Sequence, residues 1–396
     1  MPSFWLFFAQ LLKKFLSLLP RFEKKEDYVF SRSLERKSRS ERTDVRVVAF
    51  YLPQFHRIPE NDVWWGEGFT EWTNVQRGKP WFLGHYQPHI PHPDVGYYDL
   101  YDDSVMEKQV AMAKYAGISG FCFYHYWFSG RRLLEMPVER MLKTKKPDFP
   151  FCLLWVNENW TRRWDGKDEE VLITQNHADE DEAAFVEDIV RAFQDPRYIR
   201  INNRPLFLVY RPLRLPRPLA TFDHWRALCR AQGIGEIYLA GVFSYEIYDP
   251  LRIGLDAAVE FPPLQAGAIA LANNSLNSLS SPSGWIYDYR TVKRNMIRRK
   301  HKKRYIVYRG VMPSWDHTSR FGNKSHVFIN SSPESYYSWL KRALQLTRTQ
   351  YQGDHRIVFI NAWNEWGEGC HLEPDERYGY AWLNATRSAI YSTPKE

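Results

Sequence analysis

The sequence predicts an α/β fold, a single (β/α)8 TIM-type barrel, and three observations lead to that expectation. Eight runs of near-continuous apolar residues recur along the chain, which is typical of strands buried on both faces of a parallel sheet. Amphipathic helical patterns lie between several of these runs. The length of 396 residues fits the size range of such barrels with insertions. A doubly wound open sheet would give a similar alternation, so periodicity alone leaves that alternative open.

The first 22 residues are predicted to form an amphipathic helix. The uncharged run before Lys13 and Lys14 is about half of the roughly 20 residues that a membrane-spanning helix needs. The positive charge follows the apolar run, whereas a signal peptide carries it in front. Leucines alternating with lysines fit a helix lying on an anionic bilayer surface. A helix docked on the protein's own body is the alternative.

The rest of the chain divides into a linker and the barrel. Residues 23–44 are charged and rich in Ser and Arg, which is typical of a linker. Residues 45–392 are predicted to form the barrel. Its strands share an apolar start and a polar or aromatic finish; they are expected in residues 45–55, 117–128, 149–160, 204–212, 236–244, 257–262, 304–315 and 355–366.

Helical patterns fill several of the intervals between these strands. Residues 102–117 are predicted to be helical, with Ser104 as the N-cap and Gly117 as the C-terminal stop. The other predicted helices lie in residues 179–193, 221–233 and 332–346, the last with Pro333 in its first turn.

Two insertions interrupt the alternation of strands and helices. Residues 56–100 form a long, aromatic first loop, which we expect to fold over the barrel mouth. Residues 265–304 run from an Ala-, Asn- and Ser-rich stretch into a basic one, which predicts a lid followed by a charged helix.

The composition is unusual mainly in its aromatic content, which is 16% with 16 Trp and 24 Tyr. Many of these residues lie beside Asn, Glu and His, a combination that suits stacking against sugar rings. The net charge of +8 is too mild to identify a partner. The four cysteines form no C-x-x-C pair and are expected to be small buried side chains in a reducing compartment.

The stretch "FINAWNEWGEG", Phe359 to Gly369, places two acids where the last predicted strand ends. Making or breaking a glycosidic bond needs one carboxylic acid to move a proton and a second carboxylate to handle developing positive charge. Glu365 and Glu368 would come within about 5–6 Å if the turn is helical. An ordinary surface acid is the alternative, but the flanking tryptophans and glycines favour a paired site.

Three other patterns are weaker. The acids at 179–181 match a D-x-D metal motif, but they also open a helix, where acids favour the helix dipole. Glu368 and His371 form E-x-x-H without a second such motif. The basic run Lys293–Arg304 suits a solvated helix face better than a phosphate site, and nucleic-acid binding would require aromatic residues among those charges. We therefore expect no metal, no cofactor and no nucleic acid.

Several long motifs together resemble a known family. "YLPQFH", "NDVWWGEGFTEWTNV", "GHYQPHIP", "GFCFYHYWF", "WVNENW", "RGVMPSWD" and "NAWNEWGEG" occur in this order. They resemble the WbsX-like family of bacterial surface-polysaccharide proteins, often called glycosyltransferases, and that family is similar to glycoside hydrolase family 99, the endo-α-mannosidases. The hydrolases carry a similar N-E-W-x-E-G stretch after the eighth strand. The resemblance implies that Glu365 is the base on the sugar 2-hydroxyl, giving an epoxide-like intermediate, and that Glu368 is the general acid/base.

The expected function is action on glycosidic bonds in lipopolysaccharide, O-antigen or other surface-polysaccharide biosynthesis, by transfer or by hydrolysis. An endo-acting hydrolase or transglycosidase outside biosynthesis and a non-catalytic sugar-binding barrel remain alternatives. The partner would be an oligo- or polysaccharide, which a lipid carrier could bear, and the location cytoplasmic, with residues 1–22 on the inner face of the plasma membrane. Besides the glutamate pair, the candidate substrate-binding residues lie in the first loop or near strand ends; they are His56, Trp64, Trp65, Glu71, Trp72, Tyr124, Tyr126, Trp127, Trp155, Asn157, Glu158, Asn159, Tyr210, Glu260, Trp315, Asp316, Trp363 and Asn364.

Overall fold

The computed structural model of the chain describes residues 43–162, 167–176, 179–267, 284–301 and 304–391. The predicted amphipathic helix of residues 1–22 and nearly all of the predicted linker lie outside the described residues. The same holds for most of the predicted lid.

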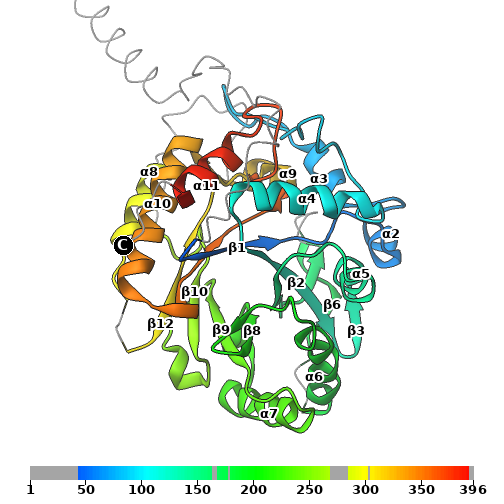
Figure 1. Cartoon of the computed structure of the whole chain (residues 1–396). Coiled ribbons are helices and arrows are strands. Elements are labelled where there is room, and N and C mark those ends of the chain that lie inside the picture. Colours follow the sequence, from blue (N-terminus) through cyan, green and yellow to red (C-terminus); the bar gives the residue numbers. More distant parts are fainter. Residues whose placement is uncertain (1–42, 163–166, 177–178, 268–283, 302–303, 392–396) are drawn as a thin grey trace, which may run out of the picture.

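Eight parallel strands of the described residues close into a barrel (Figure 1). Each pairs with its neighbours in parallel, and the first pairs with both the second and the last. This closure confirms the (β/α)8 prediction and excludes the open doubly wound sheet. In order around the barrel the strands are β1 (Arg46–Tyr51), β2 (Gly120–Phe128), β4 (Phe151–Trp155), β8 (Arg204–Val209), β9 (Tyr238–Phe243), β10 (Ala257–Glu260), β12 (Ile306–Val311) and β14 (Ile357–Ile360).

Helices surround this barrel, and the predicted ones are present (Figure 1). The predicted N-cap Ser104 is wrong, because the preceding Asp102 caps the helix and accepts a hydrogen bond from the Ser104 amide at 2.9 Å. Gly117 ends that helix in the left-handed conformation, as expected. The helices are α2 (Pro59–Trp65), α3 (Glu71–Arg77), α4 (Asp103–Ala116), α5 (Met136–Thr144), α6 (Asp179–Phe193), α7 (Pro218–Ala231), α8 (Tyr289–Arg298), α9 (Thr318–Phe321), α10 (Pro333–Gln350) and α11 (Ala381–Tyr391).

Short elements decorate the loops between the main strands and helices. The small strands are β3 (Arg131–Leu133), β5 (Trp160–Arg162), β6 (Lys167–Ile173), β7 (Arg200–Ile201), β11 (Trp285–Asp288), β13 (His326–Ile329), β15 (Asn364–Glu365) and β16 (Cys370–His371). The 3-10 turns are η2 (Pro212–Arg214), η3 (Pro250–Ile253), η5 (Gly322–Lys324), η6 (Gly353–His355) and η7 (Trp366–Glu368).

The long first loop folds onto the carboxyl ends of the strands, as predicted. Its helix α3 packs against both α9 and η7. Further along, Trp81 and Phe82 form a small hydrophobic cluster with side chains of the β11–β13 sheet. The loop therefore connects the segment after β12 with the segment after β14.

No helix among the described residues is long and apolar enough to cross a membrane. All four cysteines are buried and unbridged, as expected from their spacing.

Candidate active site

The two glutamates of the last motif lie on a short helical turn that follows β14. Glu365 precedes η7 and Glu368 ends it. Gly369 then adopts a left-handed conformation with a φ of 54° and ends the turn. This local structure confirms the helical turn on which the pairing of the two acids depends, since a regular strand would place them on different faces.

A single guanidinium holds this pair together with a third carboxylate. Arg320, on α9, donates from Nη2 to Glu365 at 3.0 Å and from Nη1 to Glu368 at 2.8 Å. Its Nε donates to Glu71 of α3 at 2.7 Å. The planar fork of arginine suits such divided recognition of carboxylates. Three loops far apart in sequence thus meet at one cation.

The close packing of this cluster explains one glycine of the motif. A Cβ added at Gly367 would lie 1.8 Å from the Glu71 Oε1 and 2.7 Å from the Arg320 Nε. Any other residue at this position would have to displace the clamp.

The cluster is unequally exposed to solvent, and this difference affects its proton affinity. The side chain of Glu365 is 5% exposed and that of Glu368 is 20% exposed. Burial raises the pKa of Glu365 to about 8, and the charge of Glu368 acts in the same direction, while Arg320 opposes both. Burial lowers the pKa of Arg320, but the three carboxylates outweigh it and raise that pKa well above its usual value.

Three tyrosines, two on β2 and one directly after β8, share this environment. Burial raises the pKa of Tyr124 and Tyr126 well above the usual value, and the charges of Glu365 and Glu368 raise it further. Burial also dominates the raised pKa of Tyr210, to which Glu368 contributes. These phenols therefore stay neutral and can donate hydrogen bonds near the acid pair.

A buried carboxylate fixes the two tryptophans of the motif by hydrogen bonds. Glu373 accepts hydrogen bonds from the indoles of Trp363 and Trp366, at 3.1 and 2.7 Å. Gln109 and Tyr98 donate to the same carboxylate at 2.7 and 3.0 Å. Burial raises the pKa of Glu373 to about 7, against the effect of these four donors. Trp363 is thus a fully buried residue that supports the acid pair.

Asn364 and Trp72 tie the motif to the first strand and the first loop. The Asn364 side chain accepts from the Leu52 amide at 2.8 Å and donates to the Leu52 carbonyl at 2.9 Å. Trp72 is 5% exposed, packs against the Trp366 ring and donates its indole N–H to the Tyr98 carbonyl. Both residues are buried and hold the motif against the first strand and the first loop.

Asp316 locks the first loop to the segment after β12. Its carboxylate contacts His85 Nε2 at 2.6 Å and accepts from Gln87 at 2.7 Å and from the Thr318 amide. Its own amide donates to the Glu368 carbonyl at 2.6 Å. Burial raises the pKa of Asp316, but these partners outweigh it and lower that pKa. The carboxylate is therefore a structural anchor beside the acid pair.

Half-exposed aromatic side chains continue outward from the acid pair. Tyr126 packs edge-on against Trp160 of the β5–β6 hairpin, with ring centroids 5.0 Å apart. Trp160 contacts Trp64 of α2 at 5.8 Å, and Arg162 lies over the Trp65 ring. The half-buried Trp64 and Trp65 thus occupy the rim at which the sequence predicted sugar contacts.

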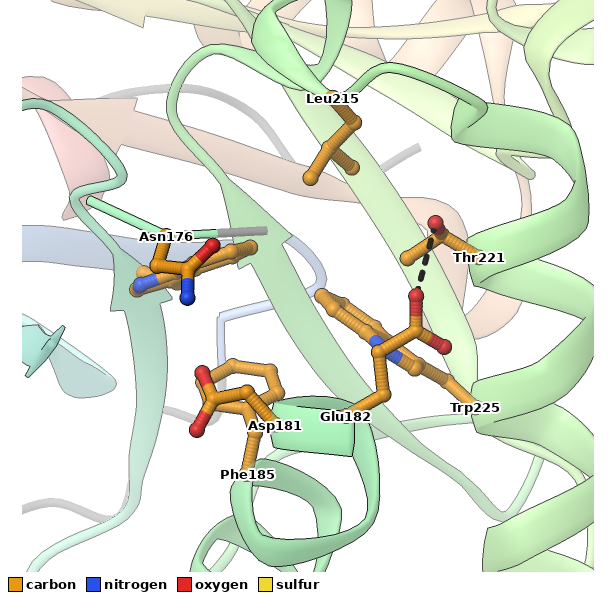
Figure 2. A pocket seen from close by; sticks show the side chains of 8 residues that line it. Asn176, Asp181, Glu182, Phe185, Leu215, Thr221 and Trp225 are labelled. Atoms are coloured by element: carbon orange, nitrogen blue, oxygen red, sulfur yellow. Dashed lines mark hydrogen bonds between the residues drawn. The ribbon is translucent and has the colours of Figure 1, made fainter. Parts of the chain in front are cut away.

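Three predicted site residues instead face the surrounding helices, because side chains alternate along a strand. Trp127 donates its indole N–H to Asp181 of α6. Trp155 packs against Trp225 of α7 and lines a small pocket between α6 and α7 (Figure 2). Glu260 contacts His301 at 2.6 Å and also pairs with Arg309 of β12.

The remaining candidates bridge loops. Asn157 exchanges hydrogen bonds with the Arg211 backbone, and Glu158 accepts from the Arg211 side chain at 2.7 Å. Asn159 accepts from the Gln175 amide. His56 is buried against Tyr101, and burial lowers its pKa to about 4. Trp315 is buried and packs edge-on against His317.

Sequence reasoning missed Arg320, Glu373 and Gln109: Arg320 forms the clamp, Glu373 bonds the tryptophans of the motif, and Gln109 donates to Glu373. Arg320 follows the motif "RGVMPSWD" by four residues, so a cation in a mouth loop opposite two acids was the available signal. Gln109 lies inside a helix and has no comparable signal.

Neither metal pattern builds a metal site in the described part of the chain. No group of three or more His, Cys, Asp and Glu side chains there is placed to hold an ion. Asp181 of the D-x-D pattern accepts from Trp127, and His371 of the E-x-x-H pattern stacks on Trp366 with centroids 3.6 Å apart.

The chain is similar in sequence to a known family and to two curated proteins. A family model described as "Glycosyltransferase WbsX" matches residues 47–386. The chain is 48% identical, over 348 residues, to an uncharacterized protein named WxcX from Xanthomonas campestris pv. campestris strain B100, and equally to its counterpart in a second strain. The aligned region covers 88% of this chain and 50% of the relative, so the chain spans about half the length of the curated relatives it matches.

Solved structures of low sequence identity share the fold. One described as a glycoside hydrolase-like protein aligns with a TM-score of 0.56 at 16% identity, covering 88% of this chain and 94% of its own. The GH99 endo-α-mannosidase from Bacteroides thetaiotaomicron aligns with a TM-score of 0.55 at 15% identity, covering 89% and 98%.

Proposed function

The chain belongs to the WbsX glycosyltransferase family, and from that premise, which makes it a carbohydrate-active enzyme, we propose that it acts on glycosidic bonds through Glu365 and Glu368. The observation that carries this proposal is the clamp of Arg320 on both glutamates. The clamp holds two acids in one site with unequal burial, which is how a pair of carboxyl groups acquires separate acid and base roles.

The proposed chemistry assigns each proton to one of the two acids. The raised pKa of Glu365 favours the proton of the free pair on Glu365, and the proposed reaction starts from the form in which that proton has moved to Glu368. Glu365 then takes the proton of the sugar 2-hydroxyl, whose oxygen bonds to the anomeric carbon. Glu368 gives its proton to the leaving oxygen as that glycosidic bond breaks. An incoming hydroxyl then attacks the anomeric carbon and loses its proton to Glu368, while the bond between the anomeric carbon and the 2-oxygen breaks and Glu365 returns its proton to the 2-oxygen. The neutral phenols of Tyr124 and Tyr126 would donate hydrogen bonds to the sugar.

The incoming hydroxyl decides between transfer and hydrolysis. A sugar hydroxyl gives transfer, and water gives hydrolysis. We propose transfer in the assembly of a bacterial surface polysaccharide, such as lipopolysaccharide O-antigen, on a lipid-linked glycan at the cytoplasmic face of the plasma membrane. The family description supports transfer.

A product assay with matched variants tests the proposal. The purified chain is incubated with a panel of glycans and nucleotide sugars, and products are followed by mass. Glu365→Gln and Glu368→Gln each keep the side-chain shape but cannot transfer protons, so turnover should fall about 10²–10⁴-fold. Glu107→Gln, on an exposed position of α4, is the control and should retain full turnover.

The outcome separates the alternatives. Products that carry a new sugar–sugar bond support transfer, and products that carry only water support an endo-acting hydrolase. If both glutamine variants turn over at the wild-type rate, the pair is not catalytic. If the wild type binds glycans and forms no product, the barrel is a sugar-binding module.

A further inference from the structure

The outer surface of α8 and the adjoining β11–β13 sheet combine exposed cations with an exposed indole, and the acid pair does not use them. Trp285 is 50% exposed at the start of β11. A tryptophan ring that is open to solvent is the kind of side chain that a membrane–water interface favours.

The cations beside this tryptophan form a stripe. Arg290, Arg294 and Arg298 are exposed and four residues apart on α8, so they line one face of the helix. Tyr289, Val292 and Met296 on the opposite face are buried. Figure 1 shows α8 on the outside of the barrel beside α10.

A further cation lies at the other end of the stripe. Lys324 is exposed and lies in η5, and the next residue, Ser325, accepts a hydrogen bond from the Trp285 amide at 2.8 Å. The stripe therefore runs from Lys324 past Trp285 along α8. We call this surface the α8 surface; it consists of Trp285, Arg290, Arg294, Arg298 and Lys324.

Few acids offset these charges. Asp288 accepts a bidentate contact from Arg290, and Glu334 is exposed in the first turn of α10. In the part of the chain that the structure describes, no ion pair joins Arg294, Arg298 or Lys324 to a carboxylate. The charge of the surface is thus available to an external anion.

We propose that the α8 surface docks on an anionic lipid bilayer. A tryptophan beside a row of cations matches the requirements of the bilayer interface, where the aromatic ring enters the headgroup region and the cations meet anionic lipids. A nucleic acid would instead require several aromatic side chains interleaved with the cations, whereas the exposed aromatic of this surface, Trp285, precedes the helix that carries the three arginines.

One short segment connects the α8 surface to the acid pair. Arg320 of α9 lies four residues before Lys324, so the docked surface and the clamp belong to the same loop after β12. A glycan carried by a lipid in that bilayer would meet the mouth of the barrel at this edge. This consequence rests on the proposed function, whereas the docking itself does not.

Vesicle flotation of the full chain tests the docking. The vesicles contain equal parts of phosphatidylglycerol and phosphatidylcholine, with pure phosphatidylcholine as reference. Arg294→Glu combined with Arg298→Glu should weaken partitioning at least about 20-fold, since each basic residue near an anionic surface contributes about fivefold. Trp285→Ala should also weaken partitioning, and the difference from the wild type should persist at high salt because it comes from lost apolar contact. Lys108→Glu with Lys114→Glu, which changes the exposed face of α4 by the same charge, should have little effect.

Further variants decide against the proposal if it is wrong. If the two-arginine variant floats like the wild type while Lys13→Glu with Lys14→Glu does not, the contact lies in the N-terminal run and the α8 surface is not a docking site. Equal loss in the α4 control would mean that only net charge matters. Binding of single-stranded DNA that depends on Arg294 and Arg298, without vesicle binding, would assign the surface to nucleic acid. Each outcome is independent of turnover on a soluble sugar.

Discussion

At the scale of single residues, Arg320 contributes one positive charge to a group of three carboxylates, each of which bonds a different nitrogen of its guanidinium. Its side chain is 10% exposed, so these contacts are weakly screened by solvent. The residue therefore decides both how the two acids of the turn are spaced and how much negative charge the site can hold.

Replacing Arg320 separates these two contributions. Arg320→Ala leaves three acids, two of them buried, without their cation, and we expect a loss of about 3–5 kcal/mol in the free energy of unfolding. Arg320→Lys retains the charge but cannot bond three carboxylates in fixed directions, so stability should largely return while turnover stays low. Thermal melts and product assays measure the two effects. A lysine variant with wild-type turnover would show that the fork geometry is dispensable.

The proton held by the acid pair predicts the dependence of activity on pH. The pKa of Glu365 is raised to about 8, and two acids this close titrate as a pair. Near neutral pH the pair therefore holds one proton, and it loses that proton as the pH rises through about 8. Since the proposed reaction needs one acid and one base, kcat/KM should fall along this limb.

The matched variant checks the assignment. In Glu368→Gln the neighbouring charge is gone, so the pKa of Glu365 should drop. With a substrate whose leaving group departs without acid help, this variant should keep its turnover above pH 8. Wild-type activity that rises through that region would instead mean that the pair works without a shared proton.

At the scale of elements, the regular strands and helices were predictable from sequence and the contacts among loops were not. All eight barrel strands follow from apolar runs, because a strand buried on both faces leaves that pattern. The direction of side chains near strand ends did not follow: Trp127 and Trp155 are as aromatic as Tyr126 but face the helices. Alternation predicts two faces, and only the closed barrel decides which is inside.

The candidate site shows the same division. The motif identified the glutamates and the helical turn between them, because their spacing is local. The contacts of Glu71 with Arg320 and of Glu373 with Gln109 join residues more than 200 positions apart, and no periodicity in one sequence encodes such pairs. Asp102 took the place of Ser104 as N-cap because both residue types suit that position.

The turn η7 gives the prediction that belongs to this scale. Gly367→Ala would place a methyl group where the Glu71 and Arg320 side chains meet. The backbone of η7 can tolerate alanine, so we expect the fold to persist, with a loss of about 1–3 kcal/mol from overpacking and a large loss of turnover. Gly353→Ala is the control for stability. That glycine has a φ of 53° and open space around it, so alanine there strains the backbone without crowding any side chain. A Gly367→Ala variant with normal activity would contradict the tight clamp.

At the scale of the whole molecule, the barrel supplies rigidity and the loops at its carboxyl ends supply the chemistry. The ion pairs of Arg320, the hydrogen bonds to Glu373 and the contacts of Asp316 join residues from the first loop to the segment after β14. All of these contacts lie among the described residues. Other proteins share this fold at 15–16% identity, which shows how little of the sequence the architecture itself requires.

This division predicts what removal of residues 1–22 does. The cation and the three carboxylates of the clamp all lie in the described barrel, so turnover of a soluble glycan and the unfolding temperature should both stay at full-length values. Partitioning to anionic vesicles should fall, because Lys13, Lys14 and the leucines around them would no longer contribute charge and apolar area. Flotation of the truncated chain beside the full chain, at low and high salt, measures that part. Loss of soluble turnover on truncation would mean that the segment docks on the barrel, as the alternative interpretation of its sequence holds.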